Sequence, residues 1–390
     1  MKIPKRYIIG KEKTMMTEKM TYRWLWSCLV AGGLLLLSGC SASSSDDDLQ
    51  QPEQVALQLR AVTRTDDAFT IPGGDNPASS VRLFLATLTP TNENPNNYSL
   101  TEGSFSYKNS QWSSTNSLNP LIVKEETPYY LYGYMPSSIS ATPSAPDEGY
   151  SKGINLSFTD LPAITSDDIC VLVGVQLVGA NSTGSPTVTE GQYGFRSNIK
   201  GQNYVNLLMA HLYAKLKVSF KIDPNYAELR SIHLKEVTLT SKYADGASVT
   251  VNLRSGQGIG SPIFTSSGDP EEHILTLFKS SAVIPEKVLD KALANQNDPT
   301  KSLVSLDLPA YCRPPVAVVG TYNLTLTTTY DVYDLKGQNL GERVSENKIK
   351  FDVAEVKPGQ EKKLVLTVKP TYLYVLSDND ADNPTITLGE

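Results

Sequence analysis

Residues 213–222 read YAKLKVSFKI, and patterns of this kind recur along the chain. Apolar side chains alternate in this stretch with lysine and serine, the period of a β-strand with one buried face. Similar apolar or alternating stretches recur, separated by clusters of Gly, Pro, Asn, Asp and Ser, so we expect strands at 55–62, 81–85, 129–135, 169–177, 232–240, 249–253, 273–278, 322–333 and 363–368. Many short strands with this punctuation predict an all-β protein.

Three shorter signals refine this prediction. Asp245-Gly246 is a tight-turn dipeptide between two expected strands, and Pro358-Gly359 marks another turn. Pro285 predicts the start of a short helix reaching Leu293, because proline is favoured at a first helical position.

The N-terminal segment has the parts of an export signal. Basic residues (Lys19, Arg23) precede an apolar run from Trp24 to Leu37, and small residues lead to Cys40. The run is shorter than the roughly 20 residues that a spanning helix needs. We therefore expect residues 1–39 to be a signal peptide, cleaved between Gly39 and Cys40, with lipid on Cys40 as a permanent anchor. An uncut signal anchor is the alternative, and Met15, Met16 and Met20 are candidate translation starts.

Length and composition bound the exported part. Residues 40–54 form a polar, acidic tether, and the remaining length suits two domains, predicted at 55–207 and 208–370, followed by a tail at 371–390. The net charge is −6 without a basic block, so we expect no nucleic-acid partner. Cys170 and Cys312 stand in apolar surroundings typical of buried thiols, and the sequence leaves their pairing open.

Residues 203–222, NYVNLLMAHLYAKLKVSFKI, carry a His-x-x-Ala-Lys-Leu pattern at His211, Ala214, Lys215 and Leu216. Together with YYLYGYMP at 129–136 and VKPGQ at 356–360, this pattern resembles the fimbrillin family of Bacteroidales, the type V pilins and their relatives. The resemblance implies two tandem transthyretin-like antiparallel β-sandwich domains after a lipoprotein signal peptide. It also implies a subunit of cell-surface fimbriae that contributes to adhesion and biofilm.

The acidic run at 46–48 resembles the export tag of Bacteroidetes lipoproteins, which implies the outer face of the outer membrane. A plain spacer is the alternative.

The resemblance further implies assembly by strand exchange. In the family, an Arg-specific protease removes the first strand, and a strand of a neighbouring subunit fills the groove by β-augmentation. The cleavage candidates here are Arg60, followed by a small residue, and Arg64, which we favour because its neighbours look loop-like. The donor-strand candidates alternate in the tail: Tyr372, Tyr374, Leu376, Ile386 and Leu388. In the alternative, the first strand stays in place and the tail completes its own domain.

The sequence offers no catalytic constellation, so we expect no enzyme and no cofactor. His211, His233 and His273 lie far apart, which predicts no metal site and a structural role for His211. Residues 378–383 begin like a calcium loop but lack its glycine and its final glutamate. The expected partners are other fimbrillin subunits and, through Cys40, membrane lipid. The alternative function is a monomeric surface lipoprotein that binds host glycans or proteins, or a pilus tip or anchor component.

Overall fold

The computed structural model describes residues 54–64, 80–90, 97–109, 111–115, 120–179, 187–198, 203–241, 247–266, 272–306, 308–314, 321–352, 356–370 and 382–388. These residues belong to one compact unit, Pro52–Glu390. The predicted signal peptide with Gly39, the predicted lipidation site Cys40, and the tail residues Tyr372, Tyr374 and Leu376 lie outside the described residues. In the described part of the chain, no helix is long and apolar enough to cross a membrane.

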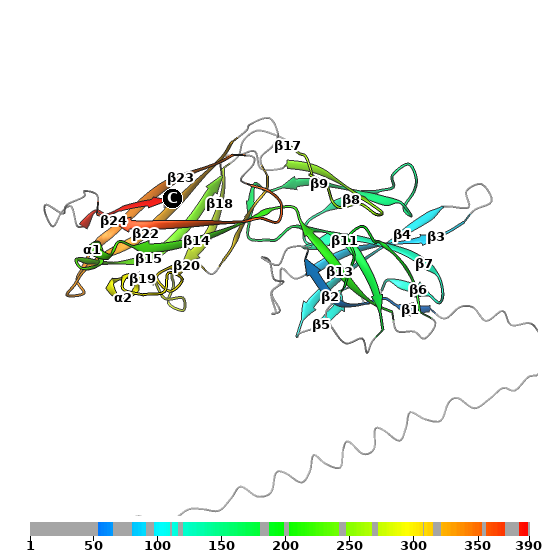
Figure 1. The fold of residues 1–390 in the computed structure, drawn as a ribbon, viewed down its shortest axis with the longest axis horizontal. Helices are drawn as coiled ribbons and strands as arrows, with labels where there is room; N and C mark the ends of the chain where they lie inside the picture. The colour runs from blue at the N-terminus through cyan, green and yellow to red at the C-terminus, as the bar shows by residue number, and fades with distance from the viewer. Residues whose placement is uncertain are drawn as a thin grey trace, which may run out of the picture. The chain divides into compact units, whose positions relative to one another are not determined.

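The described residues form an all-β structure of several sheets, as predicted (Figure 1). The first large sheet, sheet B, has the order β2 (Gln58–Arg64), β13 (Tyr204–His211), β11 (Cys170–Val178), β7 (Pro128–Met135), β3 (Ser80–Leu88), β4 (Tyr98–Lys108) and β5 (Gln111–Ser114), with β12 (Gly194–Arg196) beside β7. Sheet C has the order β17 (Phe264–Ser266), β16 (Ala247–Arg254), β9 (Gly153–Leu161) and β8 (Ala141–Ser144). A small pair joins β1 (Gln54–Ala56) to β6 (Ile122–Lys124).

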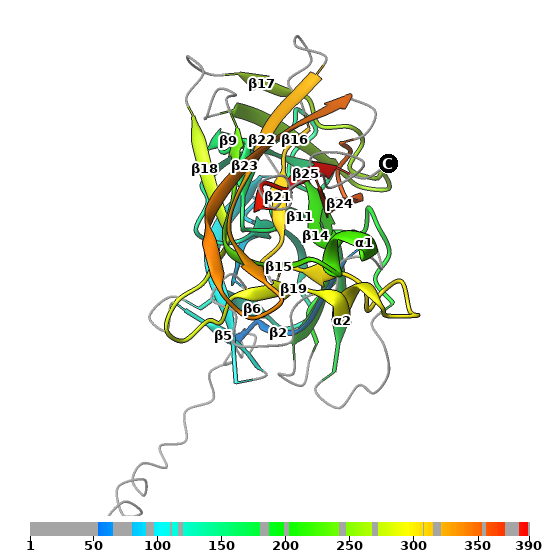
Figure 2. The same ribbon diagram turned by 90° about the vertical axis from the view of Figure 1, so that its left-hand side faces the viewer.

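Two further sheets contain most of the later strands. Sheet D has the order β10 (Ile164–Thr165), β21 (Ala310–Cys312), β14 (Ala214–Ile222), β24 (Glu361–Lys369) and β25 (Thr385–Leu388), with β20 (Val304–Ser305) beside β14. Sheet E has the order β18 (His273–Lys279), β15 (Arg230–Ser241), β22 (Thr321–Asp334) and β23 (Asn339–Asp352), with β19 (Lys287–Leu289) beside β15. The long hairpin of β22 and β23 is drawn in orange in Figure 2.

Alternation along the strands divides the apolar residues among three cores. In β7, Leu131 and Met135 point to one face of sheet B, where they pack with residues of β2, whereas Tyr132 and Tyr134 point to the opposite face and pack on sheet C. The third core lies between sheets D and E and includes Phe220 of β14. Sheet B is therefore buried on both faces, which explains the nearly continuous apolar sequence of β11.

Two strand pairings connect early and late parts of the chain. β16 follows the predicted boundary between residues 207 and 208 in the sequence, yet it pairs antiparallel with β9, which precedes it. β10 likewise pairs with β21. β16 stands between β17 and β9 in sheet C, and Figure 1 labels β17, β9 and β8 of this sheet. Residues 207 and 208 are themselves neighbours within β13. A division of the chain at this point stays a prediction, and sheets C and D each contain strands from both sides of it.

Two local predictions differ from the structure. The strands on either side of Asp245-Gly246 do not form a hairpin, because β15 joins sheet E and β16 joins sheet C; the dipeptide itself lies outside the described residues. The helix predicted from Pro285 is also wrong, because residues 287–289 form β19 on β15. A helix begins only after Asp290, whose carboxylate accepts a hydrogen bond from Leu293 N and caps α2 (Lys291–Ala294).

One short helix has no counterpart in the predictions. It is α1 (Pro224–Ala227), which Asp223 caps in the same way as Asp290 caps α2. The turn at Pro358-Gly359 is present, with Gln360 N donating to Lys357 O at 3.2 Å.

Candidate strand-exchange site

The strand β2 lies between β13 and β5 in sheet B, whereas β1 pairs with β6 outside it. β2 pairs in parallel with β13 on one side and contacts β5 on the other. It thereby covers the apolar cluster that contains Leu131 and Met135 of β7, which we call the inner core of sheet B. Its entry is fixed by two backbone hydrogen bonds, from Leu57 N to Leu121 O at 2.8 Å and from Gln58 N to Asn203 O at 2.9 Å. Within the sheet, β2 pairs with β13 alone. Removal of β2 would therefore disrupt sheet B less than removal of a central strand, which pairs on both sides.

The segment is held in place by apolar side chains. Leu57, Leu59 and Val62 are buried at 3%, 5% and 8% exposure in the inner core of sheet B, beside Leu207 and Met209 of β13. Full burial of one such side chain contributes roughly 1.5–3 kcal/mol, so the three together contribute about 5–9 kcal/mol. Loss of this segment would leave an apolar groove between β13 and β5.

The two arginines predicted as cleavage sites both lie in β2. Arg64 is the last residue of the strand, at the pairing of Met209 with Arg64. Arg60 is half-buried and lies at a register shift of the β2–β13 pairing. Leu59 pairs with Val205 and Ala61 pairs with the next residue, Asn206, so Arg60 has no partner in the ladder. A cut after Arg64 would separate the whole of β1 and β2 from the rest of the chain, whereas a cut after Arg60 would leave Val62 behind.

The described part of the predicted donor tail completes sheet D of its own chain. β25 pairs antiparallel with β24, Ile386 is 3% exposed in the core between sheets D and E, and Leu388 is 40% exposed. This placement favours the alternative in which residues 385–388 complete their own domain.

Several contacts hold β25 in this position. The Arg230 guanidinium donates from Nε to Asp382 Oδ1 at 2.9 Å, and Arg343 Nε donates to Asn383 Oδ1 at 2.9 Å. Tyr330 OH donates to Pro384 O at 3.4 Å, and burial raises the pKa of the Tyr330 phenol to about 12. Transfer of this tail to another subunit would have to break all of these contacts.

The residues of the His-x-x-Ala-Lys-Leu pattern lie where the chain passes from sheet B to sheet D. His211 ends β13 and Ala214 begins β14. Leu216 is buried in the core between sheets D and E, and Lys215 Nζ lies 3.6 Å from Glu361 Oε2 of β24.

His211 also belongs to a buried polar cluster that the sequence analysis missed. Its Nδ1 lies 2.8 Å from Asp168 Oδ1 and 3.3 Å from Cys170 Sγ, and Sγ lies 3.4 Å from the same carboxylate oxygen. All three residues are buried. Cys170 and His211 face each other directly in the pairing of β11 with β13, a register that sequence spacing does not reveal.

Both cysteines expected to be buried are buried, and no disulfide joins them. Burial raises the pKa of the Cys312 thiol to about 12.

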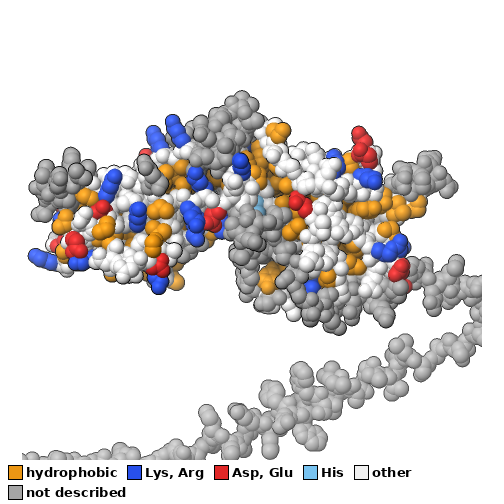
Figure 3. All heavy atoms as spheres, in the orientation of Figure 1, with side chains coloured by type: hydrophobic (Ala, Val, Ile, Leu, Met, Phe, Trp, Pro, Cys, Tyr) orange, Lys and Arg blue, Asp and Glu red, His pale blue; other side chains and the backbone are white. Residues whose placement is uncertain are grey.

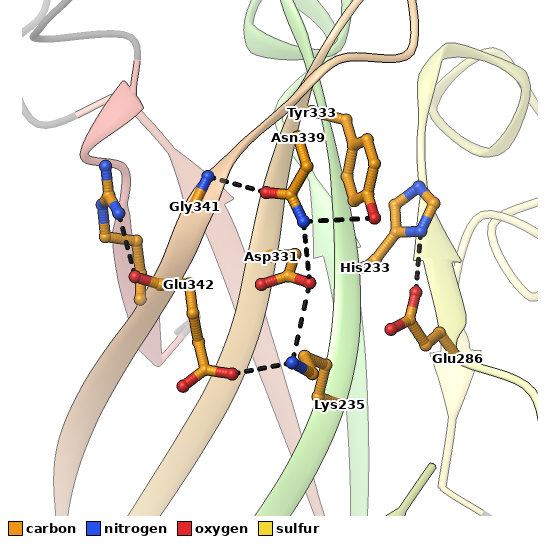
Figure 4. Close-up of polar contacts among 9 residues, drawn as sticks. His233, Lys235, Glu286, Asp331, Tyr333, Asn339, Gly341 and Glu342 are labelled. Carbon is orange, nitrogen blue, oxygen red and sulfur yellow. Dashed lines mark hydrogen bonds and ion pairs between the residues drawn. The ribbon is translucent and has the colours of Figure 1, made fainter. Parts of the chain in front are cut away.

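A second polar network crosses the outer face of sheet E (Figure 4). Lys235 Nζ of β15 lies 2.7 Å from Glu342 Oε2 and 3.7 Å from Asp331 Oδ2, and its hydrogen bond to Glu342 raises the Lys235 pKa. Asn339 Nδ2 donates to Asp331 Oδ2 at 3.1 Å. These contacts pair charges across three neighbouring strands and suit a stabilising role, because each charge shown has an opposite or polar neighbour.

The same view places His233 between two partners. Its Nδ1 lies 3.0 Å from Glu286 Oε2, and its ring stacks on Tyr333 with centroids 4.2 Å apart. His233 is thus engaged with neighbours on both β22 and the segment before β19.

A shallow groove lies beside the free part of the edge of β16. β17 pairs only with Ala247, Ser248 and Val249, and beyond them a groove of about 560 Å³ opens between β16 and the loop at 257–263. Its lining includes the polar side chains Thr250, Asn252 and Gln257. On the face drawn in Figure 3, the Lys and Arg side chains of the described residues are spread among other side chains and do not gather in a single patch.

No family model matches the chain, and no curated protein matches it. Among solved structures, a fimbrial protein from Bacteroides vulgatus is similar at 12% identity, with a TM-score of 0.44, over 85% of this chain and 98% of that chain. A candidate cell adhesion protein from Bacteroides uniformis is similar at 13% identity, with a TM-score of 0.37, over 86% and 96%. Another from Bacteroides fragilis is similar at 10% identity, with a TM-score of 0.41, over 86% and 97%.

The chain thus matches Bacteroides fimbrial proteins and candidate cell adhesion proteins across most of its length, and these are proteins of the kind that its sequence motifs resemble. At such identities the likeness concerns the fold.

Proposed function

We propose that the chain is a subunit of cell-surface fimbriae that is exported as a lipoprotein through Cys40 and assembles by strand exchange, contributing to adhesion. Its two parts would be tandem transthyretin-like sandwiches that share strands at their junction. The single observation that carries the proposal is β2, a strand that pairs only with β13, lies between β13 and β5 and ends at Arg64; with the preceding Leu57, it buries three apolar side chains.

In this proposal, an Arg-specific protease cuts after Arg64. The cut releases the lipid anchor together with β1 and β2, and the apolar groove then accepts a strand from a neighbouring subunit. Backbone hydrogen bonds to β13 would provide affinity, and side chains in the positions of Leu57, Leu59 and Val62 would fix the register.

The donor is the C-terminal tail, for which two arrangements stay open. Residues 385–388 leave their own β24 and pair with the neighbour, or the preceding segment with Tyr372, Tyr374 and Leu376 is donated while β25 keeps its place. The buried Ile386 and the Arg230–Asp382 ion pair favour the second arrangement, because they hold β25 to its own sheet.

The test compares Arg64→Gln with the matched variant Arg60→Gln in the chain from Ser41 to Glu390. After treatment with an Arg-specific protease, we expect the wild type and Arg60→Gln to lose residues up to Arg64, detected by mass spectrometry, and to form ladders on a native gel. Arg64→Gln should keep its N-terminus and stay monomeric. The proposal fails if Arg64→Gln polymerises as the wild type does, or if the cleaved wild type stays monomeric at high concentration.

A second candidate function is a monomeric surface lipoprotein that binds a glycan. The groove beside β16 favours it, because Thr250, Asn252 and Gln257 offer hydroxyl and amide groups of the kind that recognise sugars. Binding on a glycan array that is lost in Asn252→Ala, in a protein that the protease does not convert to polymers, would favour this function over the first.

A further inference from the structure

We propose that Asp168, Cys170 and His211 form a binding site for a divalent metal ion of the zinc class. The three residues lie at the start of β11 and the end of β13, where the chain leaves sheet B for sheet D. This site is independent of strand exchange, since none of its residues belongs to β2 or to the tail.

The spacing of the donor atoms fits a tetrahedral ion. Bonds of about 2.0–2.1 Å from zinc to nitrogen or oxygen and about 2.3 Å to sulfur place ligand atoms about 3.3–3.5 Å from one another. The two separations that involve Cys170 Sγ, 3.3 and 3.4 Å, are close to these values. The third, 2.8 Å between His211 Nδ1 and Asp168 Oδ1, would have to open by a few tenths of an ångström. A sulfur, a nitrogen and an oxygen atom from three side chains thus surround a position for an ion. The fourth ligand is a water molecule or a further protein atom.

The chemical nature of the donors selects the ion. Thiolate, imidazole and carboxylate are the ligands that zinc uses in proteins, whereas magnesium and calcium take oxygen ligands and avoid thiolate. A divalent ion with one thiolate and one carboxylate forms a neutral group. A neutral group suits a site whose three residues are all buried, because burial of net charge is costly.

Metal binding requires one proton to leave. Without an ion, the distances describe a hydrogen-bonded cluster in which the Cys170 thiol and the His211 Nδ1–H both donate to Asp168 Oδ1. On binding, the thiol proton is released to solvent and the imidazole proton moves to Nε2, so that Sγ and Nδ1 each present a lone pair. The reaction is therefore the exchange of one proton for one divalent ion, with no change of oxidation state.

The backbone already places the ligands. Cys170 and His211 are direct partners in the antiparallel ladder, Asp168 precedes Cys170 by two residues, and Leu212 N donates to Ile169 O at 2.8 Å beside them. Little conformational entropy remains to be lost when the ion binds. Because the cluster is buried, the ion would be taken up during folding, and the folded protein would release it slowly.

The experiment refolds the full chain, purified in mild detergent, from urea and a chelator in the presence of Zn²⁺ alone or Co²⁺ alone. We expect one equivalent of zinc to stay with the protein through gel filtration, measured by elemental analysis. The cobalt form should show a thiolate-to-metal charge-transfer band. Cys170→Ser should lose this band and bind zinc roughly tenfold or more weakly. Cys312→Ser, which changes the other buried thiol, is the matched control and should keep both properties.

Refolded wild type without retained zinc and without the cobalt band would overturn the proposal, and the cluster would then be hydrogen-bonded only. Equal zinc retention by Cys170→Ser and Cys312→Ser would overturn it as well, because the ion would then sit elsewhere. The cobalt spectrum decides the matter even if Cys170→Ser does not fold, since a thiolate band needs a cysteine ligand and a band that persists in a variant with serine at 28, 40 and 312 can come only from Cys170.

Discussion

Leu59→Ala tests how firmly the first strand is held. Leu59 is 5% exposed in the inner core of sheet B, on a strand whose ladder bonds go to β13 alone. Truncation of a buried leucine costs about 2–5 kcal/mol, according to how far the surroundings can collapse. β2 can shift toward the core because its other side contacts β5 without a ladder, so we expect the free energy of unfolding to fall by about 3 kcal/mol.

The chain carries its own probe for this measurement. Trp112 of β5 packs against the same core, and the other two tryptophans, Trp24 and Trp26, belong to the predicted signal peptide. In the chain from Ser41 onward, tryptophan fluorescence therefore reports on the neighbourhood of β2. With a urea dependence of about 3 kcal/mol/M, the midpoint of unfolding should fall by about 1 M.

Gln58→Ala is the matched control, because Gln58 is the exposed neighbour of Leu59 in the same strand. It should change the free energy of unfolding by no more than about 0.5 kcal/mol. If Leu59→Ala behaves like Gln58→Ala, then β2 does not contribute its side chains to the core. The apolar groove left by its removal, and the strand exchange built on it, would lose their basis.

Three further predictions follow from the buried tail, thiols and tyrosines. Ile386→Ala should lower the free energy of unfolding by about 2–4 kcal/mol, while Leu388→Ala, at the exposed end of β25, should cost less than about 1 kcal/mol, both measured by urea titration; equal effects would contradict the packing of β25. A thiol reagent at pH 8 should leave Cys170 and Cys312 unmodified in the folded protein and modify both in urea, because both are buried and the Cys312 pKa is raised to about 12; rapid labelling without urea would contradict their burial. Burial raises the pKa of Tyr132 and Tyr330 above the ordinary value of 10.0, so the folded state keeps protons that the unfolded state loses. Their stabilising contribution should be complete below pH 10 and decline as the pH rises through 10 toward 12, seen as a falling thermal midpoint together with late, cooperative tyrosine ionisation; a midpoint that stays constant over this range would contradict it.

The positions of the strands could be predicted from the sequence because alternation is a local property. Strands were expected at 129–135 and 213–222, and the structure has β7 at Pro128–Met135 and β14 at Ala214–Ile222, because short runs rich in strand-forming side chains are recognisable locally. The assignment of strands to sheets was beyond such reasoning. The dipeptide Asp245-Gly246 predicts a local hairpin, but the next strand, β16, is drawn to β9 by long-range pairing that no local signal encodes.

The error at Pro285 has a similar cause. Lys287, Val288 and Leu289 fit a helix as well as a strand in isolation, and their pairing with β15 decides for the strand. Asp290, by contrast, is a recognisable cap, and Asp223 followed by proline was a readable signal for α1.

The candidate sites likewise differ in whether they depend on local sequence or on long-range strand pairing. Arg64 and the alternating residues of β2 could be proposed from the sequence, because the candidate cleavage site and the strand are contiguous. The cluster of Asp168, Cys170 and His211 could not, since it depends on the register between β11 and β13. The short spacing of Asp168 and Cys170 was its only local trace.

The pairing of β9 with β16 also dictates an order of events during biosynthesis. A ribosome makes β9 long before β16, and in between it makes β13, β14 and β15. Throughout that interval Ile154, Leu156 and Phe158 lack the strand that later completes their sheet. The nascent chain therefore exposes apolar side chains of an incomplete sheet until β16 has been made. A chaperone that binds apolar strands would be needed most at this stage.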